Sequence, residues 1–232
     1  MIDNAEKAFQ RSKVYELTAY AFGEPSEEFL SFARSGELLK HMKESLRTHP
    51  YAVEMDIRPL ELIIEELKDI DIHELRLEYG KMISPEMNFL YECNYHPPLN
   101  ASEEMSDVAG FYRAFSMGFT GDRPDHISMQ LEFMRLLTLK EAKALLDRDT
   151  ENEGVCVSAQ KKFLHSHLGR WTSTLSRMAG GIRFYGPFSA LIKNWLTVEC
   201  TYLSAGTDEI FYNCRSSSGE ENSDCFSKGG CA

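Results

Sequence analysis

The amino-acid sequence predicts an all-α protein with one compact multi-helix domain, residues 1–205, followed by a flexible tail, residues 206–232. Three observations support this prediction. Apolar residues recur at intervals of three and four in several segments, and runs that alternate apolar with polar residues are nearly absent. The eight prolines lie between these segments or in their first turns. After residue 205 the period is lost and Ser, Gly and Glu cluster.

The predicted helices follow one another along the chain, each with an apolar stripe on one side. The stripe within residues 125–147 is the widest, which predicts burial on two sides. In chain order the stripes are Val14, Leu17, Ala21; Leu60, Ile63, Ile64, Leu67; Val108, Phe111, Phe115; Ile127, Leu131, Met134, Leu137; Leu164, Leu168, Trp171, Leu175, Met178; and Phe188, Leu191, Ile192, Trp195, Glu199, Tyr202. Only Glu199 breaks the apolar character of its stripe.

Two segments between the predicted helices differ from each other in composition. Residues 147–154 (DRDTENEG) are polar and predict a surface linker. Residues 81–106 contain three prolines around several aromatic side chains and predict a long apolar loop. Long ordered loops more often serve a function than connect helices alone.

Composition and charge exclude several classes of protein. The hydrophobic fraction of 43% and the charged fraction of 26% are globular values. The net charge of −11 argues against a protein that binds nucleic acid through phosphates. No run approaches the roughly 18 apolar residues of a membrane helix, and the first residues do not resemble a signal peptide. We therefore expect a cytoplasmic protein without stable membrane insertion.

The sequence lacks the common enzyme motifs. It contains no GxxxxGK[ST], GxGxxG, GxSxG or HExxH pattern, so no nucleotide loop, nucleophile elbow or zinc helix is predicted. His165 and His167 are two residues apart, which on a helix directs them about 200° apart and prevents joint chelation of one metal. We expect a protein that is not an enzyme and has no metal site in the helical domain.

The segment from Arg123 to Met134 is the strongest local signal, and two interpretations of it stay open. Pro124 followed by Asp125 is typical of a helix start, where an acidic residue stabilises the positive end of the helix dipole. Alternatively, Asp125 and His126 face a groove and bind a cationic or backbone group of a partner. The residue types fit both interpretations.

A second cluster surrounds Tyr91 and Glu92, between Phe89 and the proline pair at residues 97–98. One interpretation is aromatic core packing, with Glu92 as a capping or salt-bridge residue. The other is a peptide-binding lip, in which tyrosines supply rigid contact area and Glu92 supplies charge.

Several blocks, in this order, resemble the TorD/DmsD/NarJ family of molybdoenzyme maturation chaperones over about residues 8–203. The most specific are residues 111–115 (FYRAF) and the Pro-Asp-His segment with its downstream LEFM. The full set is Val14-Tyr15-Glu16-Leu17, Leu77-Glu78-Tyr79, Tyr91-Glu92, residues 108–115 (VAGFYRAF), Pro124-Asp125-His126, Leu131-Glu132-Phe133-Met134, and His167-Leu168 with Trp171. Leu90 stands where relatives commonly carry proline, and Ser116 where many carry glycine.

The resemblance implies a TorD-like, all-helical cytoplasmic chaperone. Members of this family bind the N-terminal leader, often a twin-arginine signal peptide, of a molybdopterin oxidoreductase catalytic subunit. They hold the subunit for cofactor insertion and assembly before export. The resemblance matches the Asp-His pair of the family to Asp125 and His126, and its Tyr-Glu to Tyr91 and Glu92.

The chemistry of these residues suits such a leader, because arginine prefers planar carboxylates that it can engage with two hydrogen bonds. Methionine adapts to imprecise apolar segments. Because the pKa of a free histidine side chain is about 6.5, we expect His126 to make binding sensitive to pH. The predicted peptide-binding residues are Tyr91, Glu92, Pro124, Asp125, His126, Met129 and Glu132.

Other questions stay open from the sequence. We expect no tightly bound cofactor, although transient contact with the molybdopterin cofactor or a guanine nucleotide is left open, as is a monomer or a homodimer. Cys214, Cys225 and Cys231 lie in the tail without a CxxC pair, which gives a zinc ribbon little support. The alternative function is a helical adaptor or metal-handling protein that uses these cysteines.

Overall fold

Ten α-helices build the part of the chain that the computed structural model describes, namely residues 3–51, 55–96, 101–119 and 123–206. They are α1 (Asn4–Ala21), α2 (Glu27–Arg34), α3 (Glu37–Leu46), α4 (Arg58–Asp69), α5 (Ile72–Ile83), α6 (Ala101–Ala114), α7 (Ile127–Asp147), α8 (Thr150–Phe163), α9 (Gly169–Met178) and α10 (Tyr185–Leu203). These residues contain no β-sheet, only one isolated bridge between Tyr91 and His126. The all-α prediction is confirmed, whereas the predicted tail lies outside the described residues from residue 207 onward.

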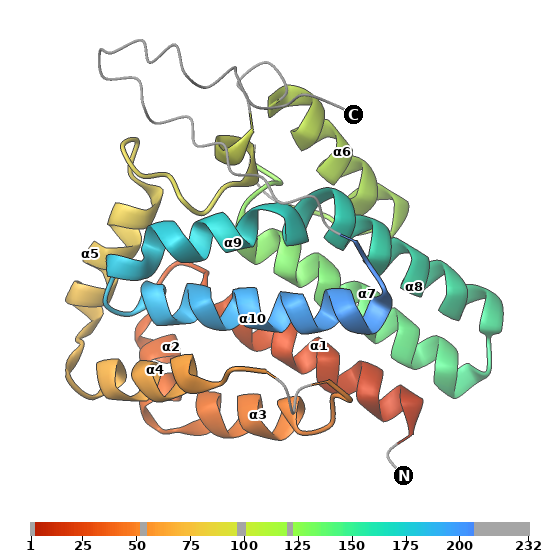
Figure 1. Ribbon diagram of the computed structural model, residues 1–232, viewed down its shortest axis with the longest axis horizontal. Coiled ribbons are helices and arrows are strands. Elements are labelled where there is room, and N and C mark those ends of the chain that lie inside the picture. Colours follow the sequence, from red (N-terminus) through yellow and green to blue (C-terminus); the bar gives the residue numbers. More distant parts are fainter. Residues whose placement is uncertain (1–2, 52–54, 97–100, 120–122, 207–232) are drawn as a thin grey trace, which may run out of the picture.

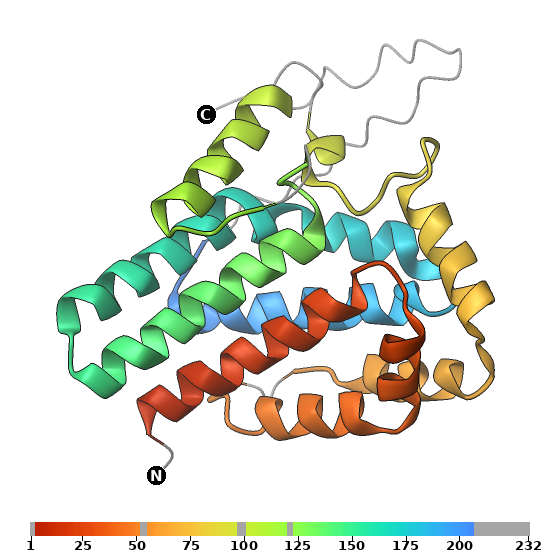
Figure 2. The same cartoon turned by 180° about the vertical axis from the view of Figure 1, so that it is seen from behind.

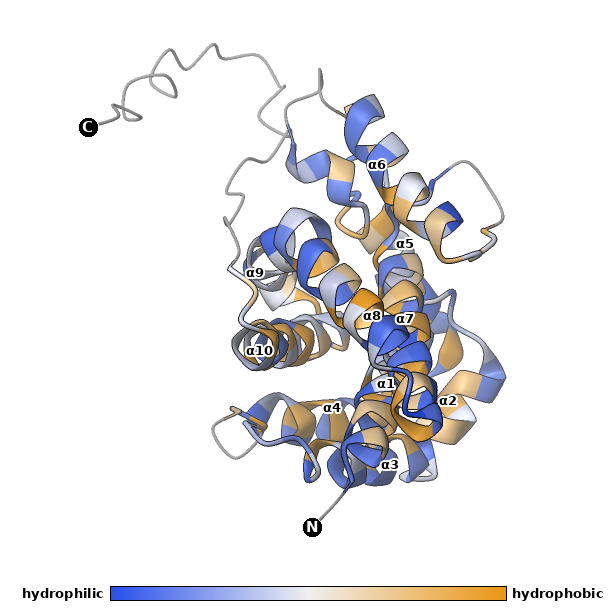
Figure 3. Ribbon diagram, turned by 90° about the vertical axis from the view of Figure 1, so that its right-hand side faces the viewer, coloured by the Kyte–Doolittle hydropathy of each residue, from blue (hydrophilic) through white to orange (hydrophobic). Residues whose placement is uncertain are grey.

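The long helices α1, α7 and α10 form the centre of the domain (Figure 1). The most extensive helix contact is between α1 and α7, which lie side by side when the molecule is seen from behind (Figure 2). On the far side of α7 packs α8, while α10 packs on α9 and α4. Apolar side chains from all ten of these helices form the buried core, and hydrophilic residues occupy parts of α6 and α8 (Figure 3). None of the described helices is long and apolar enough to span a membrane.

The predicted linker at residues 147–154 is wrong, because α8 already begins at Thr150. Arg148 adopts a left-handed conformation with φ 57° and ends α7. The Asp149 side chain then accepts the backbone N–H of Asn152 at 3.0 Å and caps α8. Acidic residues in the first turn of α8 also suit the helix dipole, so a polar stretch here starts a helix rather than a loop.

Between α8 and α9 the helix continues through a π-helical segment, η4 (Leu164–Leu168). The α8–η4–α9 stretch is therefore helical from end to end, and it contains the periodic segment that the sequence predicted from Leu164 to Met178. Segments of π-helix occur frequently at functional sites. Here η4 carries His167, whose side chain is buried.

A buried polar network inside the core explains the charged residue in the apolar stripe of α10. The guanidinium of Arg11 on α1 donates two hydrogen bonds of 2.8 Å to Glu199 and one of 2.8 Å to Glu141 on α7. Tyr15 and His49 also contact the Glu199 carboxylate, at 2.9 and 3.1 Å. Because every charge in this network has a partner of opposite sign, the network can lie inside the core.

Candidate functional site

The loop before α6 and the start of α7 meet, and they bring the two predicted motifs together. The backbone N–H of Glu92 donates to the carbonyl of Asp125 at 3.0 Å, and that of Ile127 donates to the carbonyl of Leu90 at 2.8 Å. These bonds form the isolated bridge between Tyr91 and His126. Tyr91-Glu92 and Asp125-His126 therefore belong to one site, although 30 or more positions separate them in the sequence.

The Asp125 carboxylate is fully buried at this junction. Arg123 donates from Nε to Oδ1 and from its terminal nitrogen to Oδ2, both at 2.8 Å, and the backbone N–H of Cys93 donates to Oδ2 at 3.1 Å. The Arg123 guanidinium also lies over the ring of Tyr91, 4.3 Å from its centroid. Burial alone would raise the pKa of Asp125, but the hydrogen bonds and charge of Arg123 outweigh it and the pKa is lowered.

The Glu92 carboxylate is also fully buried, in the short 3₁₀-helix η2 (Glu92–Tyr95). Its partners are the side-chain amide of Gln130 on α7 and Nδ1 of His167 on η4, the latter at 3.2 Å. Trp171 donates its indole N–H to the same Gln130 at 3.3 Å. Burial opposes the charge on Glu92, but hydrogen bonds from His167 and His96 lower its pKa.

His167 joins this cluster to the surface. Its Nε2 lies 3.1 Å from Asp107, whose side chain is largely exposed, and its Nδ1 lies 3.9 Å from Glu104. Burial alone would lower the pKa of His167, but Glu92 and the charges of Asp107 and Glu104 raise it above its ordinary value. Ligand atoms of Glu92, His96 and Glu104 lie within 4.8 Å of one another, so these are the described residues best placed to hold a metal ion.

The structure corrects the expected availability of the two predicted carboxylates. Neither Glu92 nor Asp125 is open to solvent, and each already accepts hydrogen bonds from side chains of its own chain. Pro124 is buried too, and its carbonyl accepts the hydroxyl of Tyr112 at 2.8 Å. The roles of these residues in peptide binding stay predictions, but direct contact with a partner requires at least one internal partner to move.

His126 supports the helix-start interpretation, as the N-cap of α7. Its Nδ1 accepts the backbone N–H of Ser128 at 3.3 Å and lies 2.7 Å from the Ser128 hydroxyl. Burial lowers the pKa of His126 to about 4, which keeps the ring neutral near neutral pH. The expected pH sensitivity of binding through His126 is therefore not supported, and Asp125 lies before the N-cap rather than in the first turn of the helix.

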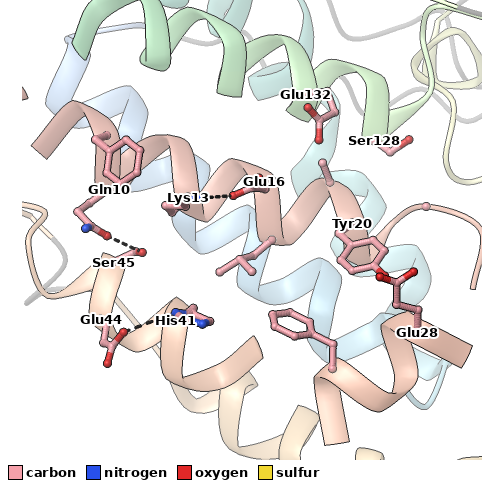
Figure 4. A pocket seen from close by; sticks show the side chains of 15 residues that line it. Gln10, Lys13, Glu16, Tyr20, Glu28, His41, Glu44, Ser45, Ser128 and Glu132 are labelled. Carbon is pink, nitrogen blue, oxygen red and sulfur yellow. Dashed lines mark hydrogen bonds and ion pairs between the residues drawn. The ribbon is translucent and has the colours of Figure 1, made fainter. Parts of the chain in front are cut away.

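Beside this junction, a groove of about 820 Å³ runs between α1, α2, α3 and the start of α7. The side chains that line it come from all four helices and point into the space between them (Figure 4). The predicted residue Glu132 lines this groove, whereas Met129 is half-buried on the same helix and does not. Ser128, which contacts the His126 cap, connects the groove to the junction.

The groove is apolar inside and acidic around its edge. Phe9, Leu17, Tyr20 and Phe32 are among the apolar residues that line it, and Phe9 and Tyr20 are 39% and 38% exposed. Four carboxylates and one ammonium group also line it, namely Glu16, Glu28, Glu44, Glu132 and Lys13. Exposed aromatic residues beside carboxylates are the composition expected where an amphipathic, basic segment binds.

Sequence reasoning missed most of this groove. Phe9 and Tyr20 lie outside the apolar stripe of α1 that the period predicted, and a bulky aromatic residue off the stripe is the signal that could have identified them. No sequence pattern connects these positions with Glu28 or Glu44, because α2 and α3 reach the groove only in the folded chain.

Comparison with known proteins gives two results. A family profile described as "Nitrate reductase delta subunit" matches residues 47–177, which is more than half of the chain. The chain is also 28% identical, over 178 residues, to a protein named "Perchlorate reductase assembly chaperone protein" from Dechloromonas aromatica (strain RCB). This alignment covers 74% of the present chain and 78% of the relative.

Proposed function

We propose a function for this chain, which belongs to the nitrate reductase delta subunit family of TorD/NarJ-type molybdoenzyme maturation chaperones. In this proposal it binds the N-terminal leader of its client in the groove between α1, α2, α3 and α7. The client would be the catalytic subunit of a molybdopterin oxidoreductase. In this proposal the chaperone holds the subunit in the cytoplasm until the cofactor is inserted and assembly is complete, and it catalyses no reaction itself.

The single observation that carries this proposal is the pairing of an apolar interior with an acidic edge in the groove. An amphipathic helix in a hydrophobic groove is a recurring mode of peptide recognition, with apolar side chains inside and charged ones at the rim. Tyr20 and Phe9 offer the exposed apolar surface, and Glu28 and Glu132 offer negative charge. A leader that combines basic residues with an apolar stretch, such as a twin-arginine signal peptide, is complementary to both.

Glu16 and Glu132 are already partly neutralised inside the protein. Arg135 donates to Glu16 at 2.9 Å and to Glu132 at 3.0 Å. Glu28 has no salt-bridge partner among the described residues, so it is the groove carboxylate most available to a basic side chain. The expectation that no cofactor is tightly bound stays a prediction.

The test begins by purifying the full-length protein from its native cells and identifying the oxidoreductase subunit that accompanies it. The synthetic leader of that subunit is then the probe in a binding titration. We expect Tyr20→Ala and Phe9→Ala to weaken leader binding about tenfold each, because exposed aromatic residues are common binding hot spots. Tyr51→Ala is the matched control, since Tyr51 is 43% exposed and does not line the groove.

Circular dichroism of each variant shows whether the helices are intact. If folded Tyr20→Ala and Phe9→Ala proteins bind the leader as tightly as the Tyr51→Ala control, the groove is not the leader site. Loss of binding in all three variants alike would indicate a general effect on the fold and would also contradict the assignment.

A further inference from the structure

The junction between the η2 loop and α7 contains every element of a binding site for an arginine side chain. The Asp125 carboxylate accepts two parallel hydrogen bonds of 2.8 Å from one guanidinium group, and the ring of Tyr91 lies against that group at 4.3 Å. Bidentate carboxylate pairing and an aromatic face are the two interactions that distinguish arginine from lysine. In this structure the guanidinium group belongs to Arg123 of the same chain.

The two sides of this contact differ in how firmly they are held. Asp125 is 0% exposed, and it is fixed by the N–H of Cys93 and by the backbone bonds of the Tyr91–His126 bridge. The Arg123 side chain is 39% exposed and reaches Asp125 from only two positions away. The carboxylate that accepts the hydrogen bonds is therefore held in place by the fold, whereas the arginine that pairs with it is partly open to solvent.

We propose that Asp125 and Tyr91 form a binding site for the guanidinium group of an arginine in the client leader, and that Arg123 occupies this site in the free protein until the client displaces it. This inference rests on the proposed function, because the leader supplies the competing arginine. It also restores a role for Asp125 and Tyr91 in peptide binding, through an exchange of one arginine for another.

The exchange avoids the most unfavourable intermediate state. A buried carboxylate without a counterion would be strongly destabilised, but replacing one guanidinium with another keeps the charge paired throughout. Arg123 moves from a half-exposed position into water, so its release requires little rearrangement. A lysine ammonium cannot reproduce two parallel hydrogen bonds, which makes the site selective for arginine.

Competition by Arg123 lowers the apparent affinity of the leader. The leader arginine enters the site only as Arg123 leaves it, so loss of the Arg123 contact reduces the net binding free energy of the leader. Removing Arg123 should therefore strengthen the binding of an arginine-bearing leader, which is the opposite of what a purely structural arginine predicts.

The first test needs no client. Full-length Arg123→Ala protein is titrated with methylguanidinium or, at equal ionic strength, with methylammonium, and the thermal midpoint Tm is measured. We expect methylguanidinium to raise the Tm of the variant by about 2 °C or more, because it binds only the folded state. Methylammonium should not raise it, and the wild type should not respond because Arg123 fills the site.

Adding Asp125→Asn to the same background should abolish the response to methylguanidinium. If Arg123→Ala does not fold, Arg123→Gln takes its place in the same titration, because glutamine retains more of the chain and one amide donor. A folded variant that shows no selective rise with methylguanidinium overturns the proposed site.

The second test measures leader affinity. We expect Arg123→Gln to bind the arginine-bearing leader about threefold or more tightly than wild type, and to show no such gain when the leader arginines are replaced by lysine. Leader binding that is indifferent to both changes overturns the displacement and leaves the proposed function in place. A selective methylguanidinium response without leader binding by either protein supports the site and contradicts the proposed function.

Discussion

Two arginines in this protein make the same contact with a carboxylate in very different surroundings. In the core, Arg11 is 2% exposed and pairs with Glu199, a residue 188 positions away that lies on α10. At the junction, Arg123 is 39% exposed and pairs with Asp125, two positions away. Because the hydrogen bonds measure 2.8 Å in both places, bond length does not distinguish them.

The difference lies in what each arginine connects and in whether it can leave. Arg11 joins α1 to α7 and α10, and its release would leave two buried carboxylates without a guanidinium partner. Arg123 joins no distant helices through its side chain, and a second arginine from outside could take its position. The same ion-pair chemistry therefore secures packing in the core and permits exchange at the surface.

The largest expected effect is that of Arg11→Met. This change leaves Glu199 and Glu141 buried near each other without their counterion, and breaking a buried pair in this way costs about 3–5 kcal/mol. Urea unfolding followed by circular dichroism measures the loss. A cost near zero would show that the core pair is as exchangeable as the surface pair, and the distinction between the two arginines would fail.

Arg123→Gln should cost less, about 1–2 kcal/mol, because the glutamine amide and the Cys93 N–H can both donate to Asp125 and solvent screens the half-exposed end of the pair. The same urea experiment measures this value beside that of Arg11→Met. Equal losses in the two variants would place Arg123 among the packing residues and argue against an exchangeable role.

The pH dependence of the unfolding free energy also distinguishes the junction from the core, because His167 lies at the junction. Glu92 on η2 and Glu104 and Asp107 on α6 raise its folded-state pKa above the unfolded value of about 6.5. A raised pKa contributes stability that is complete below about pH 6.5 and is lost as the pH rises through the folded-state pKa. Unfolding free energies of wild type should therefore fall over this range, and those of His167→Gln should fall less.

Two other buried groups titrate outside that range. Burial lowers the pKa of His126 to about 4, so its contribution is complete above about pH 6.5 and is lost only as the pH falls toward 4. Arg11 lowers the pKa of Glu199 to about 2, so the core pair does not titrate near neutral pH. Identical pH profiles for wild type and His167→Gln would remove His167 as the titrating group.

The sequence predicted the all-α class and six helical segments, but it gave no apolar stripe for α2, α3, α5 or α8 and no contacts between distant side chains. The stripe around Leu60 and Ile63 is local, and it appears in the structure as α4. The bridge that joins Tyr91 to His126 was not predicted, because a contact across 35 positions leaves no periodic trace. The burial of Glu92 could not be read either, since its partner His167 lies 75 positions away on a π-helical segment.

At the polar stretch after Asp147 the sequence led to a wrong prediction rather than to a missing one. Its composition suggested a loop, yet Asp149 caps a helix and the acidic residues that follow stabilise its first turn. Glu199 was visible in the sequence as a single charge in an apolar stripe. Its role depends on Arg11, which nothing in the sequence distinguishes from the other charged residues of α1.

The smallest expected effect concerns Glu28, an exposed groove carboxylate that has neither a buried position nor an arginine of its own. Exposed charge pairs contribute about 0.2–1 kcal/mol, so Glu28→Gln should weaken leader binding by at most about fivefold, and added salt should narrow the difference. Its neighbour Glu27 is also exposed, does not line the groove and carries the same charge on the same helix, so Glu27→Gln is the matched control.

Both variants are compared with wild type in leader titrations at low and high salt. Because long-range attraction by the net charge of the protein would affect both glutamates equally, a loss confined to Glu28→Gln locates the basic part of the leader in the groove. Equal losses would reduce the role of Glu28 to general electrostatic attraction and would favour the Asp125 site for the specific contact with a leader arginine.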